Sequence, residues 1–123
     1  MCRIERLKAE IFKSLAHPTR IRILELLRDA STTGYCELGE KCGGERRGEL
    51  CVCKITPALR IEQSNASQHL AHLKQRGLIR GRREGKSVYY SVTNPKVFEL
   101  LELVGELLEE QLKENQDALE MMR

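Results

Sequence analysis

A chain of 123 residues, with 32% charged and 4% aromatic residues, suits one helical domain with a modest leucine and isoleucine core. No apolar run approaches the ~20 residues that span a membrane, and the N-terminus lacks the hydrophobic core of a signal peptide. These features predict a cytoplasmic protein without a membrane partner, in which thiols stay reduced. The net charge of +3 is too small to identify a partner by itself.

The N-terminal part of the sequence predicts two helices and a long loop. Aliphatic residues recur at helical spacing in the first helix, at Ile4, Leu7, Ile11 and Leu15. A second helix is expected to begin at His17-Pro18, because proline is favoured at the first helical position, and its pattern stops near Ala30. Residues 31–50 are polar and glycine-rich, and a loop of this length in a compact domain is usually functional or disordered.

The next segment, residues 56–76, predicts a helix-turn-helix. Thr56 can cap the first of its helices, with Pro57 at the first helical position. Ser64 is expected to cap the second helix, which ends at Gly77. Only a few residues separate the two helices, as this motif requires.

A basic hairpin and an acidic helix complete the chain. Residues 78–92 alternate well enough for two strands, with Glu84-Gly85 as a tight turn, and a last helix covers residues 95–123. Residues 74–86 hold six basic side chains and one acid, whereas residues 99–120 hold eight acids and one lysine. A basic segment beside an acidic one indicates a polyanionic partner for the middle of the chain.

The order helix, turn, helix, basic hairpin predicts a fold that is mainly α with a small β-hairpin wing, a winged helix-turn-helix. Ala66, Leu70 and Leu73 form the apolar stripe of the second helix, and polar side chains opposite can reach base edges in a major groove. His69 lies next to the stripe, so packing or a phosphate hydrogen bond is favoured over metal ligation. The predicted contacts to double-stranded DNA are Ser64, Asn65, Ser67, Gln68, His72 and Gln75 on the helix and Arg82, Arg83 and Lys86 on the hairpin. Each polar residue alone is equally consistent with plain solvent exposure.

Four of the five cysteines lie in one short polar stretch, at Cys36, Cys42, Cys51 and Cys53. In a reducing compartment, clustered cysteines are more often metal ligands or redox sensors than structural bridges. Soft thiolates select zinc, cadmium, lead, copper(I) or trivalent arsenic. Pro57 fits poorly inside a helix that begins at Cys51, so we expect the regular helix to begin near Thr56, after both cysteines of the pair.

The sequence resembles the ArsR/SmtB family of metal-sensing repressors in a series of blocks: SLAHPTRIRILELL, ELCVC, SNASQHLAHLKQRGLI and RREGKSVYYSV. The resemblance covers about residues 10–93. It implies a homodimer, built from residues 1–16 and 95–123, that binds operator DNA and leaves it when an effector binds. The ELCVC block implies that Cys51 and Cys53 are effector ligands.

Around these cysteines the sequence departs from the family pattern. Thr56 stands where some arsenic-responsive relatives carry a third cysteine. Only Met1 precedes Cys2, where cadmium and lead sensors of the family often have a long arm. Cys36 and Cys42 are therefore expected to complete the ligand set.

The resulting hypothesis is a repressor that releases its operator on binding arsenite, cadmium, lead or zinc through cysteine thiolates, without an organic cofactor. Two alternatives stay open: a thiol-redox repressor in which Cys51 or Cys53 forms a disulfide, and a constitutive DNA-binding protein in which zinc only staples the loop. An enzyme is not expected, because no nucleophile, base and orienting group come together and no glycine-rich phosphate loop precedes a helix.

Overall fold

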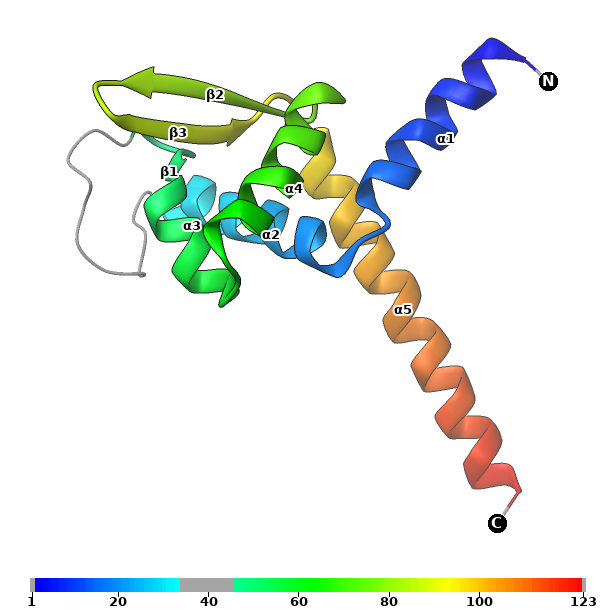
Figure 1. Ribbon diagram of the computed structural model, residues 1–123. Coiled ribbons are helices and arrows are strands. Elements are labelled where there is room, and N and C mark those ends of the chain that lie inside the picture. The colour runs from blue at the N-terminus through cyan, green and yellow to red at the C-terminus, as the bar shows by residue number, and fades with distance from the viewer. Residues whose placement is uncertain (1, 34–45, 123) are drawn as a thin grey trace.

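The computed structural model describes residues 2–33 and 46–122 as five helices and a small antiparallel sheet (Figure 1). In chain order the elements are α1 (Arg3–Leu15), α2 (Pro18–Thr33), β1 (Leu50–Cys51), α3 (Val52–Leu59), α4 (Gln63–Gln75), β2 (Ile79–Glu84), β3 (Ser87–Val92) and α5 (Lys96–Met121). This order contains the predicted helix, turn, helix and hairpin. It adds β1, a two-residue strand that no sequence pattern predicted.

The core forms around α2, which contacts α3, α4, α5 and β3. Ile23, Leu24 and Leu27 are fully buried, because aliphatic residues at helical spacing share one face of the helix. α2 runs on to Thr33, past the Ala30 at which its pattern was expected to stop. The side chains that complete the buried cluster are Leu50, Ile55, Leu70, Leu73 and Ile79. Burial of each such side chain stabilises the fold by about 1.5–3 kcal/mol, so the cluster fixes α4 against α2.

β2 and β3 form the predicted hairpin, with its turn one position later than expected. Glu84 pairs with Ser87, so the turn residues are Gly85 and Lys86, and the predicted Glu84-Gly85 turn was wrong. Gly85 has a φ of +61°. A tight hairpin turn needs this left-handed conformation at its first position, and glycine adopts it without strain.

β1 joins the other side of β3 to complete a sheet in the order β1-β3-β2. Leu50 pairs with Tyr90, and Cys51 pairs with Tyr89. Because β1 continues directly into α3, this pairing fixes the start of α3 next to β3. The sheet therefore places the cysteine pair beside the wing.

The helix-turn-helix begins earlier than predicted. α3 starts at Val52 with Cys51 as its N-cap, and Pro57 lies inside it, so the prediction of a helix start near Thr56 was wrong. The pairing of β1 with β3 sets the start of this helix, and proline at position 57 does not change that start. The cost of Pro57 is one missing backbone hydrogen bond in a helix of eight residues. The Thr56 hydroxyl does not cap the helix and instead donates to the carbonyl of Val52 at 3.0 Å.

α4 differs from the prediction at its start and agrees with it at its end. The helix begins at Gln63 with Glu62 at the N-cap position, so Ser64 lies in the first turn rather than at the cap. It ends at Gln75, and Gly77 follows with a φ of +75°, which is typical of a glycine that closes a helix.

α1 and the C-terminal part of α5 extend away from the body of the protein (Figure 1). α5 has 26 residues and is therefore about 39 Å long. Both helices expose large apolar side chains, at Ile4, Leu7, Ile11 and Phe12 on α1 and at Leu103, Val104, Leu107, Leu108 and Leu112 on α5. An exposed apolar surface of this extent is characteristic of an interaction site. No helix in the described part of the chain is long and apolar enough to cross a membrane.

Candidate nucleic-acid interface and cysteine pocket

α4 presents a polar face to solvent. Ala66, Leu70 and Leu73 are fully buried, so the helix rests on the core by the predicted stripe. The predicted contact residues Ser64, Asn65, Ser67, Gln68 and Gln75 are exposed, and His72 is half-buried. The exposed first turn adds the N–H groups of a helix N-terminus, which favour phosphate. The helix therefore offers polar side chains and a partial positive charge to an anionic surface.

His69 holds α4 against α2 rather than facing outward. Its Nδ1 accepts a hydrogen bond from Nε of Arg20 at 3.2 Å. Its ring centroid lies 4.4 Å from that of His17. Burial lowers the pKa of His69, and the neighbouring His17 and Arg20 lower it further. A neutral imidazole that packs and accepts a hydrogen bond agrees with the packing role favoured from the sequence.

The three predicted wing cations have different surroundings. Arg83 and Lys86 are exposed. Arg82 is engaged within the protein: its Nε and Nη2 donate to the two carboxylate oxygens of Glu49 at 2.9 and 2.8 Å, and its Nη1 donates to Glu84 at 2.6 Å. The hydrogen bonds from Arg82 lower the pKa of the Glu49 carboxyl, against the opposing effect of burial. Arg82 therefore ties the segment before β1 to the wing.

Cys51 and Cys53 lie at the junction of β1 and α3. Cys51 is a buried free thiol, and its Sγ accepts a hydrogen bond from the backbone N–H of Cys53 at 3.4 Å. Cys53, in the first turn of α3, is disulfide-bonded. The other two predicted ligands, Cys36 and Cys42, lie outside the described residues.

Both cysteines of the pair line one pocket, which has a volume of about 430 Å³. Thr56 and Pro57 of α3 form another part of its wall, and Gln63 of α4 and Lys86 of the wing turn contribute to the rest. Within residues 2–33 and 46–122, no group of three or more His, Cys, Asp or Glu side chains is placed to hold a metal ion. The described residues thus place one free thiol and one disulfide sulfur atom at this pocket, and a metal site there would require further ligands.

Sequence reasoning missed three residues that shape this region. Glu49 and Arg20 act through partners 33 and 49 positions away, so no local pattern marks them. Gln63 was missed because the sequence predicted Ser64 as the helix cap. α4 begins one residue earlier, so Gln63 is its first residue. The missed residues mainly position the predicted ones.

Comparison with known proteins gives a consistent assignment. The model of the family described as "Bacterial regulatory protein, arsR family" matches residues 45–80. The uncharacterized HTH-type transcriptional regulator Rv0081 of Mycobacterium tuberculosis is 38% identical over 120 residues, which cover 96% of this chain and 89% of that protein. The crystal structure of Rv0081 gives a TM-score of 0.73 at 34% identity and covers 94% of this chain and 98% of that one.

Two further proteins share this likeness. The arsenic resistance transcriptional regulator ArsR1 of Pseudomonas putida is 38% identical over 87 residues, which are 71% of this chain and 54% of that protein. The solution structure of the homodimeric winged helix-turn-helix DNA-binding domain Mb0332 of Mycobacterium bovis, a possible ArsR-family regulator, gives a TM-score of 0.69 at 30% identity. That match covers 90% of this chain and 86% of the other. The chain therefore belongs to the arsR family of bacterial regulatory proteins, and it is a DNA-binding transcriptional regulator with a winged helix-turn-helix, not an enzyme.

Proposed function

We propose that the protein represses transcription as a homodimer that binds operator DNA and releases it when a thiophilic metal or metalloid ion binds at Cys51 and Cys53. The position of the cysteine pocket is the observation that carries this proposal. Its walls include Gln63, the first residue of α4, and Lys86, in the turn of the wing. Anything bound to the two thiolates therefore lies beside both elements that are proposed to contact DNA.

The DNA-binding half of the proposal assigns base reading to α4, with Gln68 at the centre of its polar face, and phosphate binding to Arg83 and Lys86. Arg82 has a supporting role, because its guanidinium already binds Glu49. Gln68→Ala should change base preference at one position per half-site, whereas Arg83→Gln should weaken all sequences alike and flatten the salt dependence. Fluorescence anisotropy with labelled operator variants measures both. If Gln68→Ala changed neither affinity nor preference, this recognition face would be wrong.

The dimer half of the proposal assigns α1 and α5 to the subunit interface. The exposed apolar side chains of both helices exceed what one small domain can cover, and a second copy would bury them. The Mb0332 domain is homodimeric, which supports this arrangement. A twofold dimer presents two α4 helices, so operator half-sites should lie ~34 Å apart or a multiple of that distance.

The thiolates of Cys51 and Cys53 are proposed as two ligands of the effector ion, with Cys36 and Cys42 as the third and fourth. The relative ArsR1 is an arsenic resistance regulator, which supports an effector among arsenite, cadmium, lead and zinc. Such an ion, when bound, supplies strong bonds to sulfur that hold chain segments together. Cys53 has to be reduced first, because the thiolate and not the disulfide is the ligand.

A thiol-redox repressor is the second candidate function, and the disulfide of Cys53 is the observation that favours it. Forming a disulfide removes two protons and two electrons from a pair of thiols and passes them to an oxidant such as diamide. Because Cys53 lies in the first turn of α3, its oxidation acts on the same wall of the cysteine pocket as a bound ion would.

One experiment separates these functions. Reduced protein on labelled operator DNA is titrated anaerobically with arsenite, cadmium, lead or zinc, and release is followed by fluorescence anisotropy. Metal sensing predicts stoichiometric binding and a loss of DNA affinity of roughly 5–150-fold, the range that typical coupling free energies of about 1–3 kcal/mol produce. Redox sensing predicts release by diamide without any metal. If zinc bound at unchanged DNA affinity and neither the other ions nor diamide released the DNA, zinc would be a structural staple and both functions would be contradicted.

Serine variants test the residue assignment. Cys51→Ser and Cys53→Ser should each still bind the operator, because neither residue lies on the polar face of α4. Both variants should fail to release the operator, because each lacks one proposed ligand of the effector ion. Cys36→Ser and Cys42→Ser should have smaller effects, since one ligand can partly replace the other. Cys2→Ser is the matched control, because Cys2 is an exposed free thiol that precedes α1 and does not line the cysteine pocket. Normal release by both variants of the pair, or lost release in the Cys2 variant alone, would overturn the assignment.

A further inference from the structure

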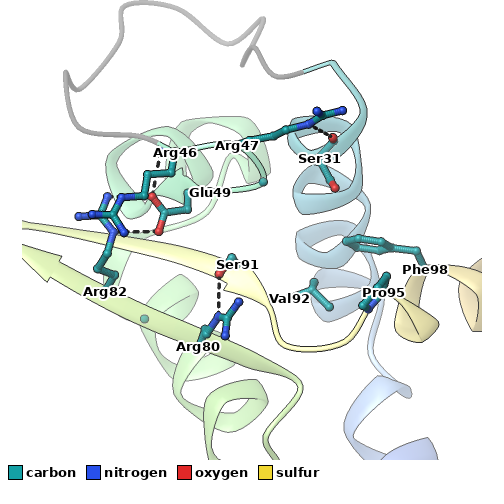
Figure 2. Close-up of a pocket in the computed structure, with 12 residues that line it drawn as sticks. Ser31, Arg46, Arg47, Glu49, Arg80, Arg82, Ser91, Val92, Pro95 and Phe98 are labelled. Atoms are coloured by element: carbon teal, nitrogen blue, oxygen red, sulfur yellow. Dashed lines mark hydrogen bonds and ion pairs between the residues drawn. The ribbon is translucent and has the colours of Figure 1, made fainter.

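A second pocket, of about 410 Å³, lies between the C-terminal end of α2, the segment before β1, the hairpin and the start of α5 (Figure 2). Its described lining residues include none of those that line the cysteine pocket. Arginine side chains approach it from two sides, Arg46 and Arg47 from the segment before β1 and Arg80 and Arg82 from β2. This arginine pocket is therefore a separate candidate site.

The charges in the arginine pocket do not balance. Four arginines face a single acid, Glu49, among the lining residues that the structure describes. Glu49 binds Arg82 and also accepts a hydrogen bond from the backbone N–H of Arg46 at 2.9 Å. The guanidinium groups of Arg46, Arg47 and Arg80 form no ion pair with any described residue.

Among the described residues, Arg47 and Arg80 contact neutral oxygen atoms at long distances. Nε of Arg47 donates to the backbone carbonyl of Ser31 at 3.4 Å, and Nε of Arg80 donates to the hydroxyl of Ser91 at 3.5 Å (Figure 2). Each guanidinium keeps further donors for an anion. The planar fork of arginine matches the two oxygen atoms of a carboxylate or phosphate group, so these side chains are suited to hold such a group.

Another wall of the pocket is apolar. Val92, Pro95 and Phe98 line it where β3 leads into α5 (Figure 2). Val92 and Phe98 are half-buried and pack against the core, which holds this wall in place. An inorganic anion or a DNA phosphate would contact the arginines and leave the apolar wall to water. A pocket with one polar end and one apolar wall instead suits a ligand that has both parts.

We propose that the arginine pocket binds a small organic anion. Its carboxylate or phosphate group meets Arg47 and Arg80, and its apolar body lies on the wall formed by Val92 and Phe98. The volume of about 410 Å³ falls within the range of small-molecule sites, roughly 300–1,000 Å³. The described lining of this site includes neither Cys51 nor Cys53, so the protein would bind a metabolite-like anion as well as the effector of the cysteine pocket.

Phenyl phosphate combines both features and serves as the probe. The reduced full chain, without DNA, is titrated by isothermal calorimetry with phenyl phosphate, inorganic phosphate and benzyl alcohol. We expect phenyl phosphate to bind at least about tenfold more tightly than either of the other two, because only it uses both walls. Arg47→Gln and Arg80→Gln should each weaken its binding by about tenfold. Arg22→Gln removes the same charge from an exposed site on α2 outside this pocket and should leave binding unchanged.

Several outcomes would overturn the proposal. Equal affinity for phenyl phosphate and inorganic phosphate would contradict the role of the apolar wall, and no binding of either would contradict the site itself. If phenyl phosphate does not bind and Arg80→Gln weakens operator binding with a smaller salt dependence, the arginines contact DNA phosphates instead. Metal-induced release is measured separately, so a failure here leaves the assignment of the cysteine pocket untouched.

Discussion

Gly77 closes α4, and its replacement tests how the proposed DNA-reading helix ends. The N–H of Gly77 donates to the carbonyl of Lys74, and that of Leu78 donates to Leu73, both at 3.0 Å. This is a Schellman end, which needs a left-handed residue at Gly77, and its φ is +75°. No atom of the described residues lies within 4 Å of the Cβ that alanine would add, so the cost of Gly77→Ala is backbone strain alone. That strain costs about 1–2 kcal/mol. Alanine regains roughly 0.4–1 kcal/mol by restricting the unfolded chain, which leaves a net loss of about 1 kcal/mol.

Urea unfolding followed by circular dichroism measures this loss. The protein concentration has to be fixed, because the stability of a dimer depends on it. Gly77→Ala should lower the urea midpoint at an unchanged m value. Gly77→Asn is the matched control and should lose less than half as much, since asparagine tolerates the left-handed region. Equal midpoints for Gly77→Ala and the unmodified chain, or an asparagine variant as unstable as the alanine variant, would refute this account of the helix end.

Three further predictions concern assembly and pH. Leu107→Glu on α5 should give a monomer in sedimentation velocity at micromolar concentration, whereas Glu106→Gln should stay dimeric; a dimeric Leu107→Glu protein would rule out this interface. Stability should fall as the pH drops below about 6.5, because the pKa of His69 lies below its usual 6.5 in the folded protein and the unfolded chain takes up the proton first. His69→Gln should flatten that slope in urea midpoints measured between about pH 5 and pH 8, and an unchanged slope would contradict it. Glu49→Gln should reduce stability at neutral pH, because the hydrogen bond from Arg82 lowers the pKa of Glu49 below its usual 4.5. The difference in stability between this variant and the unmodified chain should vanish as the pH falls below that value. A difference that does not depend on pH would exclude the charge of Glu49 as its cause.

The long elements could be predicted because amphipathic spacing is a local property of the sequence. It marked α1, α2, α4 and α5, and strand alternation marked the hairpin. β1 could not be predicted, since a two-residue strand exists only through its pairing with β3, far along the chain. The same pairing explains the error at Pro57: a local rule placed proline at the helix start, whereas tertiary structure set that start at Val52.

The polar face of α4 could be predicted from the sequence, because the pattern of buried residues defines it. The surroundings of side chains that bind distant partners could not be predicted. The buried stripe of Ala66, Leu70 and Leu73 fixes which face of α4 is polar, so the predicted contact residues follow from it. The surroundings of Arg82 could not be foreseen, because its partner Glu49 is 33 positions away. The distance between the sulfur atoms of the cysteines could not be predicted from their spacing either. A glycine-rich stretch has many accessible conformations, so the spacing in sequence does not fix that distance.

β1 and the residue before it connect the two pockets. Glu49 lines the arginine pocket and Cys51 lines the cysteine pocket, with only Leu50 between them. Leu50 is 1% exposed and pairs with Tyr90, so it links the two ends of this stretch within the core. Glu49 also holds Arg82 of β2, which extends the connection into the wing. Coupling between sites needs a physical element that both ligands act on. In the part of the chain that the structure describes, β1 and Glu49 lie between the two pockets, and we propose that an ion at Cys51 and an anion at the arginines both act on DNA binding through this short strand.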